Sequence, residues 1–122
     1  ARAVHRAGAV SLYIMDSGVM PLLSELATME FDCLIGADPV LKAGRHNIPE
    51  IRRALPGKAL WGGLSGPEHF GRGTPEGVER AVEEVFAAWG KRGLILGMAV
   101  GFRHYFSWDN LLACERAWKR LR

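Results

Sequence analysis

The sequence predicts an α/β fold in which four short strands alternate with four helices. Four apolar, β-prone runs start at Val10, Phe31, Lys58 and Gly93, and a segment with helical spacing follows each of them. This order is typical of parallel strands joined by right-handed crossovers. The 15 glycines gather at the predicted strand ends, where they indicate tight turns. Periodicity alone leaves two architectures open, a small doubly wound domain and one half of a closed barrel.

The length and composition limit the chain to one soluble domain, which we expect to span residues 1–122. A closed barrel of eight strand–helix units usually takes roughly 250 residues. The apolar fraction of 48% and the charged fraction of 24% are ordinary for a globular protein. No apolar run approaches the roughly 20 residues that span a bilayer, so we do not expect membrane insertion.

Much of the formal net charge of +3 comes from one helix at the C-terminus. Its cations are Arg116, Lys119, Arg120 and Arg122. A solvated helix face accounts for them, and without a broader basic stripe we expect no nucleic-acid partner. Cys33 and Cys114 lack metal-ligand spacing and lie in apolar contexts that fit buried free thiols. A reducing, cytoplasmic setting is the default expectation.

The first strand–helix unit follows what looks like the end of a helix closed by Gly8, so we expect the chain to start in the middle of its architecture. The strand is predicted over Val10–Met15 and stops at Asp16-Ser17-Gly18. Its helix is predicted from Pro21 to Met29, because the apolar residues there recur at helical spacing and proline suits a first turn.

Helix caps and glycines mark the ends of the elements in the second and third strand–helix units. The second strand is predicted over Phe31–Gly36 and its helix over Ile48–Leu55, with Asn47 as the N-cap. The third strand is predicted over Lys58–Trp61. We expect it to run into a glycine-rich loop over residues 62–73, which lacks a nucleotide-binding pattern.

The last two helices have clear starts. Thr74 caps a helix with Pro75 in its first position, Gly90 closes that helix, and Trp89 belongs to its buried face. The fourth strand is predicted over Gly93–Met98, and the last helix is predicted to start at Ser107 or Asp109. Its buried side is expected to consist of Leu111, Leu112, Cys114, Ala117, Trp118 and Leu121.

The candidate ligand-binding residues follow the predicted strands, because the loops after the strands line the ligand site of an α/β barrel. They are Asp16, Ser17, Asp38, Ser65, His69, Arg103, His104 and Tyr105. The aspartates more often stabilise their own turns, and His69 fits a side chain packed under the glycine-rich loop. The cluster at 103–105 combines a cation, an imidazole and a phenol, which fits either a carboxylated or phosphorylated ligand or a loop anchor. No catalytic residue is assigned.

Two stretches carry a resemblance to a known family. Leu60-Trp61-Gly62-Gly63-Leu64-Ser65, followed by Gly73-Thr74-Pro75-Glu76-Gly77-Val78, resembles the uroporphyrinogen decarboxylase superfamily, which includes methyltransferases that act on corrinoid proteins. The strand ending Asp16-Ser17-Gly18, the start Phe31-Asp32 and the late Trp108-Asp109-Asn110 agree in order. The resemblance covers nearly the whole chain. It implies four parallel βα units that form half of a TIM-type (βα)8 barrel, the C-terminal part of a longer barrel.

The metal site of the family methyltransferases is not matched. They usually hold zinc with a His-x-Cys pair after the strand that corresponds to the first strand here, and with a cysteine after the last strand. This sequence has Met15 and Ser17 at the first place and Gly97-Met98-Ala99-Val100-Gly101, without cysteine, at the second. A thioether and a hydroxyl do not replace imidazole and thiolate as zinc ligands. Zinc is therefore not expected, and the Gly-His-Gly element of the decarboxylases is also missing, at Val100.

The resemblance implies a domain that binds a small tetrapyrrole-like or corrinoid-linked substrate, for decarboxylation or methyl transfer once the barrel is completed. A corrinoid is the one cofactor it allows. The alternative is a non-catalytic binding or assembly module without the family's metal site. Because an isolated half-barrel leaves two sheet edges and an apolar inner face open, we expect a homo-oligomer or a missing N-terminal half as the partner.

Overall fold

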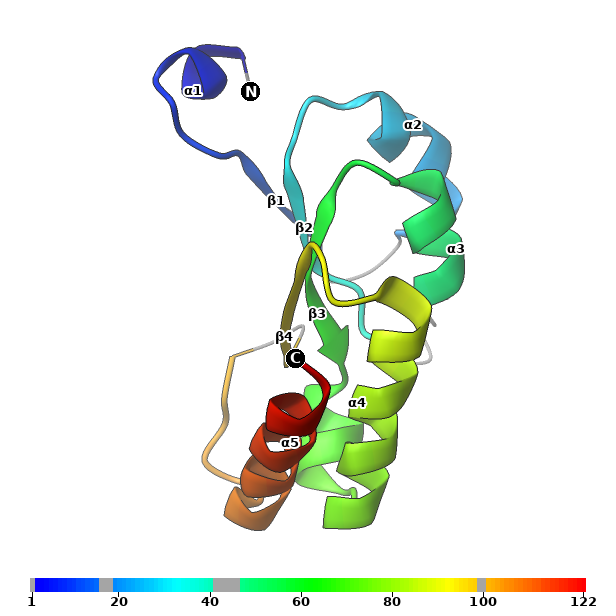
Figure 1. The fold of residues 1–122 in the computed structure, drawn as a ribbon, viewed down its shortest axis with the longest axis vertical. Coiled ribbons are helices and arrows are strands. Elements are labelled where there is room, and N and C mark those ends of the chain that lie inside the picture. The colour runs from blue at the N-terminus through cyan, green and yellow to red at the C-terminus, as the bar shows by residue number, and fades with distance from the viewer. Residues whose placement is uncertain (1, 16–18, 41–46, 99–100) are drawn as a thin grey trace.

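The computed structural model describes residues 2–15, 19–40, 47–98 and 101–122, and it confirms the predicted α/β fold (Figure 1). Four strands form one sheet in the order β1-β2-β3-β4, and every neighbouring pair is parallel. The strands are β1 (Leu12–Met15), β2 (Cys33–Gly36), β3 (Ala59–Leu64) and β4 (Leu94–Met98). This is the architecture of half of a TIM-type barrel.

Helical segments connect the strands, and α2, α3 and α4 lie on the same side of the sheet (Figure 1). The segments are α1 (Arg2–Arg6), η1 (Met20–Leu22), α2 (Leu23–Thr28), α3 (Ile48–Ala54), η3 (Gly66–Gly71), α4 (Pro75–Trp89) and α5 (Trp108–Leu121). In the described part of the chain, none of these helices has the length and apolar character that crossing a membrane requires.

The predicted helix caps are confirmed. The Asn47 side chain accepts a hydrogen bond from the N–H of Glu50 at 3.1 Å, so α3 begins where the sequence indicates. Thr74 caps α4 in the same way, with the N–H of Gly77 at 3.2 Å. Ser107, rather than Asp109, is the N-cap of α5. Each cap satisfies an N–H that has no partner inside its helix.

The prediction of a glycine-rich loop over residues 62–73 was wrong. β3 continues through Gly62 and Gly63 to Leu64, and residues 66–71 form the π-helix η3. The two glycines have φ angles of 152° and 92°, so the strand bends sharply without ending. The sequence showed the glycines but not the pairing of Gly62 and Gly63 with β4, which comes from the neighbouring strand.

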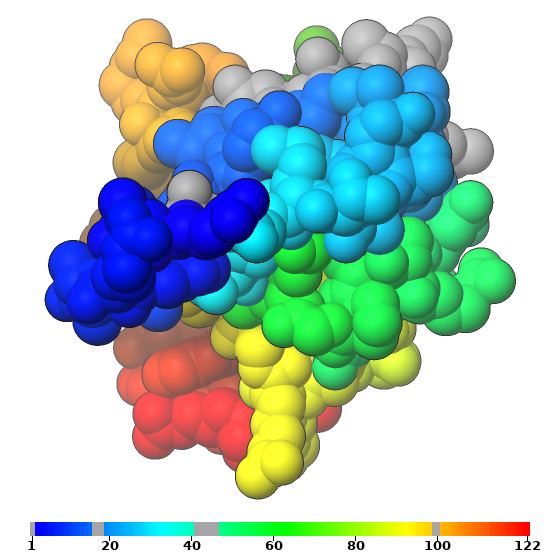
Figure 2. Space-filling view, turned by 90° about the horizontal axis from the view of Figure 1, so that it is seen from above, coloured from blue at the N-terminus to red at the C-terminus, as the bar shows by residue number. Residues whose placement is uncertain are grey.

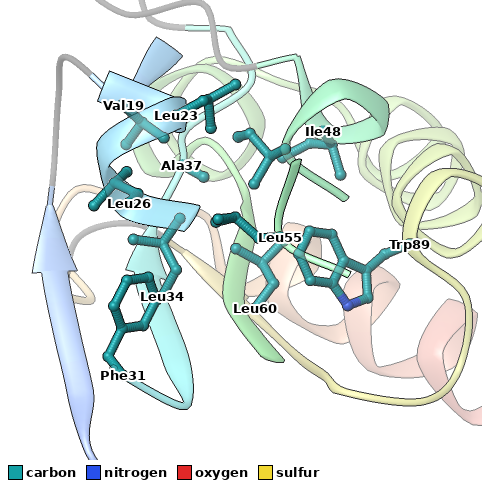
Figure 3. Close-up of a cluster of buried hydrophobic side chains, with 11 residues drawn as sticks. Val19, Leu23, Leu26, Phe31, Leu34, Ala37, Ile48, Leu55, Leu60 and Trp89 are labelled. Carbon is teal, nitrogen blue, oxygen red and sulfur yellow. The ribbon is translucent and has the colours of Figure 1, made fainter. Parts of the chain in front are cut away.

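One hydrophobic core fills the space between the sheet and helices α2 to α4 (Figure 3). Leu34 of β2 and Leu60 of β3 are fully buried on this side of the sheet. Trp89, at the end of α4, closes the cluster, and its indole N–H donates to the carbonyl oxygen of Gly93 at 2.9 Å. That hydrogen bond lets a large aromatic ring be buried without an unpaired donor.

A second cluster lies between α4, α5 and η3, and it corrects the buried face predicted for α5. Ala117 is fully buried as predicted, and Leu111, Cys114 and Leu121 pack against the cluster. Asn110 and Ala113 are also buried, whereas Leu112 and Trp118 are only half-buried. Small residues let the helix axes of α4 and α5 approach closely, which moves the larger side chains to the flanks. Arg122 stacks on the Trp118 ring, with its guanidinium carbon 4.6 Å from the ring centre.

Helix α1 lies away from the sheet and the other helices (Figure 1), and it forms a projection at one side of the space-filling view (Figure 2). It buries none of its residues, and Gly8 follows it with a φ angle of 73°, as the sequence predicts. Two exposed ion pairs connect it to the segment before β2, Arg2 with Glu30 at 3.4 Å and His5 with Asp32 at 2.8 Å. Exposed pairs of this kind contribute little stability.

Candidate functional site

Three of the predicted site residues come together at the carboxyl ends of β2 and β3. Asp38 follows β2, Ser65 follows β3, and His69 lies in η3, which starts immediately after Ser65. Asp38 and Ser65 are fully buried, and His69 is half-buried. The parallel sheet places these loops side by side, which is why residues far apart in the sequence meet here.

The contact between Ser65 and His69 fixes the state of the imidazole. The backbone N–H of Ser65 donates to Nδ1 of His69 at 3.0 Å, and the Ser65 hydroxyl caps η3 by accepting from the N–H of Glu68 at 3.4 Å. An Nδ1 that accepts a hydrogen bond leaves the proton of a neutral imidazole on Nε2. His69 therefore presents an N–H donor.

Burial lowers the pKa of His69 below its ordinary value of 6.5, although the negative charges of Asp38, Glu84 and Glu68 oppose this effect. The imidazole is therefore neutral at neutral pH. Protonation would place a second N–H opposite the N–H of Ser65, so the local hydrogen bond also favours the neutral form.

Asp38 has the turn role that its sequence context predicts, since its Oδ1 accepts from the N–H of Val40 at 2.9 Å. The preceding residue, Ala37, has a φ of 59°, a left-handed conformation that non-glycine residues rarely adopt. The carboxylate of Asp38 is fully buried, and its negative charge acts to raise the pKa of His69.

A cavity of about 470 Å³ lies beside this cluster. Its lining includes Ile48 and Pro49 at the start of α3, Glu84 and Val85 of α4, and His69. The walls are mostly apolar, with Glu84 and His69 as its charged and titratable groups. A volume of this size suits a small molecule or one arm of a larger one.

Asn110 holds the cluster in place, a role that the sequence analysis did not predict. Its side-chain Nδ2 donates to the carbonyl oxygens of His69 at 3.0 Å and Gly73 at 2.9 Å, so α5 is fastened to the C-terminal half of η3 and to the residues that follow it. Gly73 has to be a glycine, because a Cβ there would overlap the His69 carbonyl oxygen and approach that of Glu68 to 2.9 Å.

The second predicted cluster, at 103–105, does not join the first. Arg103, His104 and Tyr105 are exposed in a turn that the hydrogen bond from the N–H of Phe106 to the carbonyl oxygen of Arg103 closes at 3.0 Å. The Tyr105 ring packs edge-on against Phe106, 4.7 Å between ring centres. The tyrosine therefore serves as a loop anchor, while the cation and imidazole remain accessible. Asp16 and Ser17 lie outside the described residues.

Neither cysteine fits a metal or nucleophile role. Burial raises the pKa of both thiols, that of Cys114 to about 11. They also lie on different layers, Cys33 on β2 and Cys114 on α5. In the described ranges, no three His, Cys, Asp or Glu residues form a group that fits a metal ion.

Comparison with known proteins shows what the fold resembles. No protein-family model matches the chain, and no curated protein matches it by sequence. Among solved structures, a methyltransferase from Methanosarcina mazei has a similar fold, with a TM-score of 0.75 and 19% sequence identity. The match covers 98% of this chain and 33% of the methyltransferase, so this chain spans about a third of that protein's length. At this identity the likeness shows the fold.

Proposed function

We propose that this chain is a half-barrel that binds a corrinoid-linked substrate at the carboxyl ends of its strands and takes part in methyl transfer once the barrel is complete. The methyltransferase from Methanosarcina mazei with the same fold supports methyl transfer as the chemistry. The negative charges around His69 support the choice of a corrinoid as the substrate.

The observation that carries the proposal is the acidic surrounding of a neutral His69. Asp38, Glu68 and Glu84 all act on this imidazole, and Glu84 also lines the cavity. Carboxylates repel the carboxylate side chains of porphyrinogens, whereas they accept hydrogen bonds from the amide side chains of corrinoids. The N–H of His69 donates to the amide oxygens of the same side chains. This charge pattern favours a corrinoid over a porphyrinogen and methyl transfer over decarboxylation.

These residues hold and orient the substrate; they do not carry out the transfer. The buried thiols are protonated at neutral pH, so neither Cys33 nor Cys114 accepts a methyl group. A non-catalytic binding module remains the second candidate, because the donors here do not fit the zinc of the family methyltransferases.

A binding experiment tests the proposal. Methylcobalamin and a carboxylated porphyrin are titrated into the purified chain, and binding is followed by absorbance and equilibrium dialysis. We expect the corrinoid to bind at least about 10-fold more tightly, which corresponds to about 1.4 kcal/mol. Glu84→Gln should weaken corrinoid binding, while the neighbouring Glu83→Gln should not, because Glu83 pairs with Arg120 instead.

The opposite preference, or no corrinoid binding by an assembled chain, would refute the proposed substrate. Loss of the methyl group from bound methylcobalamin after addition of a thiol distinguishes a transferase from a binding module. A chain that binds the corrinoid but never releases its methyl group favours the binding module.

A further inference from the structure

The side of the sheet opposite helices α2 to α4 carries a row of apolar side chains. Ile14, Ile35, Trp61 and Ile95 are aligned across all four strands. Their side chains point away from the core, because side chains alternate along a strand. Leu34 directly precedes Ile35 on β2, Leu60 directly precedes Trp61 on β3, and both leucines are buried on the helical side. The exposed fraction is 66% for Ile14, 41% for Trp61 and 49% for Ile95.

We call this row of four residues the open face. A second row, Leu12, Cys33 and Ala59, continues it without any charged side chain. The Trp61 indole lies across Gly97, where a Cβ would come within 3.4 Å of its Nε1. Parallel sheets are almost always covered on both faces, so an apolar face of this kind indicates a missing layer.

We propose that a second copy of this chain covers the open face and completes an eight-stranded barrel. Within the described part, β1 and β4 each pair with only one strand, so both outer edges are available. A twofold axis along the barrel places β4 of one copy beside β1 of the other, in parallel, and does so twice. In a barrel of eight strands, the side chains that point inward fill the interior of the barrel.

Alternate strands contribute the four side chains of each layer in such a barrel. Ile14 and Trp61 lie on the odd strands β1 and β3, and Ile35 and Ile95 lie on the even strands β2 and β4. Two copies would therefore supply four such inward side chains from odd strands and four from even strands, without any other protein.

The helices at the two edges are complementary as well. In the completed ring, α5 of one copy packs beside α2 of the other. Arg116 and Arg120 of α5 pair with glutamates of α4, at 3.2 Å to Glu79 and 2.7 Å to Glu83, so this flank of α5 faces α4. By helical spacing, the opposite flank carries Trp108, Glu115, Trp118 and Arg122, and Glu115 pairs with Lys119 at 2.8 Å.

Helix α2 offers the matching surface. Ala27 lies beside Ala54 in a shallow hollow between α2 and α3, so that flank faces α3. By helical spacing, Leu22, Glu25 and Met29 lie on the other flank, and all three are exposed. In the completed barrel this flank of α5 would meet Leu22, Glu25 and Met29 of the other copy. Because Glu115 already pairs with Lys119, Arg122 opposite Glu25 is the complementary charge pair that the arrangement offers, and it argues for a second copy.

This inference rests on the sheet and the helix flanks, and it does not require the proposed methyl transfer. Light scattering of the purified chain at micromolar concentration tests it. The chain has a mass of 13.4 kDa, and twice this value is 26.8 kDa, which is the expected result. Ile14→Glu should give a folded monomer, because Ile14 is largely exposed in a single copy and a charge there costs little until the face is covered.

Ala87→Glu is the matched control, since Ala87 is exposed on α4 between the two edges, and it should leave the mass at 26.8 kDa. If Ile14→Glu fails to fold by circular dichroism, Ile95→Glu on the other edge strand makes the same test. A folded wild-type monomer would overturn the proposal. So would a dimer that both substitutions leave intact. Corrinoid binding is measured separately, so a dimer that binds no corrinoid refutes the substrate and leaves the assembly standing.

Discussion

The side chain of Asn110 donates a hydrogen bond to the main-chain carbonyl oxygen of His69 at 3.0 Å. This contact joins the start of the last helix to the π-helix that carries the site imidazole, 41 residues earlier in the chain. The position of His69 thus depends on α5 as well as on β3. A substitution at Asn110 is therefore expected to displace His69.

Replacing Asn110 with alanine should lower the free energy of unfolding by about 1–3 kcal/mol, because the buried carbonyl oxygens of His69 and Gly73 lose their donor. Urea denaturation measures this. Asn47→Ala removes one exposed cap contact and should cost only about 1 kcal/mol. If the two variants lose equal stability and Asn110→Ala binds methylcobalamin as the wild type does, Asn110 does not position the site.

The stability of the fold should decline as the pH falls below about 6.5, the ordinary pKa of histidine. Burial lowers the pKa of His69 in the folded state, so the unfolded chain binds the extra proton first. The stability due to neutral His69 is complete above the unfolded pKa and is lost as the pH falls toward the folded pKa. His69→Asn keeps an acceptor for the Ser65 N–H but does not titrate.

Thermal unfolding between pH 7.5 and 5.5 checks this prediction. The wild type should lose stability over this interval, and His69→Asn should lose less. The His69→Asn protein carries every other titrating group of the wild type, so the difference between the two curves reports His69 alone. Parallel curves for the two proteins would show that His69 is not the group responsible.

Alanine at Gly62 should destabilise the chain strongly. A Cβ there overlaps the carbonyl oxygen of Gly36 on β2, and the φ of 152° is already unfavourable for a side chain. We expect a loss of at least about 1–2 kcal/mol in urea denaturation. Gly57→Ala is the control, because a Cβ at Gly57 meets nothing within 4 Å, and it should be neutral or slightly stabilising. Similar effects of both substitutions would mean that the bend of β3 does not need glycine.

The thiol of Cys114 should react slowly with iodoacetamide in the folded protein. Burial raises its pKa from 9.0 to about 11, so at pH 8 the thiolate fraction falls on the order of 100-fold. Mass spectrometry should find both cysteines modified rapidly only after denaturation. Rapid modification of Cys114 in the native chain would show that this side chain does not pack against the hydrophobic cluster between α4, α5 and η3.

Local signals in the sequence predicted most of the architecture. Asn47, Thr74 and Ser107 act as caps because their side chains reach an N–H three residues on, which depends only on neighbouring residues. The continuation of β3 through Gly62 and Gly63 was missed because the partner strand, which the local sequence does not contain, pairs with both glycines. Ala117 was correctly predicted on the buried side of α5, but Ala113 was missed, because its burial depends on the close approach of α4.

The site was predicted in part. Asp38, Ser65 and His69 follow strands of a parallel sheet, and topology alone brings them together. The separation of Arg103 and His104 from this cluster was not predictable, because it depends on the turn that anchors Tyr105 on Phe106. Asn110 was missed because a polar residue within a helix gives no indication of carbonyl groups that come from a distant π-helix.

Hydrogen exchange of the two edge strands tests the central claim most directly, the closure of the barrel by a second copy. At low concentration the outward amides of β1 and β4 should exchange quickly. At higher concentration they should become as protected as those of β2 and β3, and Ile14→Glu should abolish this gain. Exchange at the edges that remains fast at every concentration would contradict the account, because it would leave both edge strands unpaired.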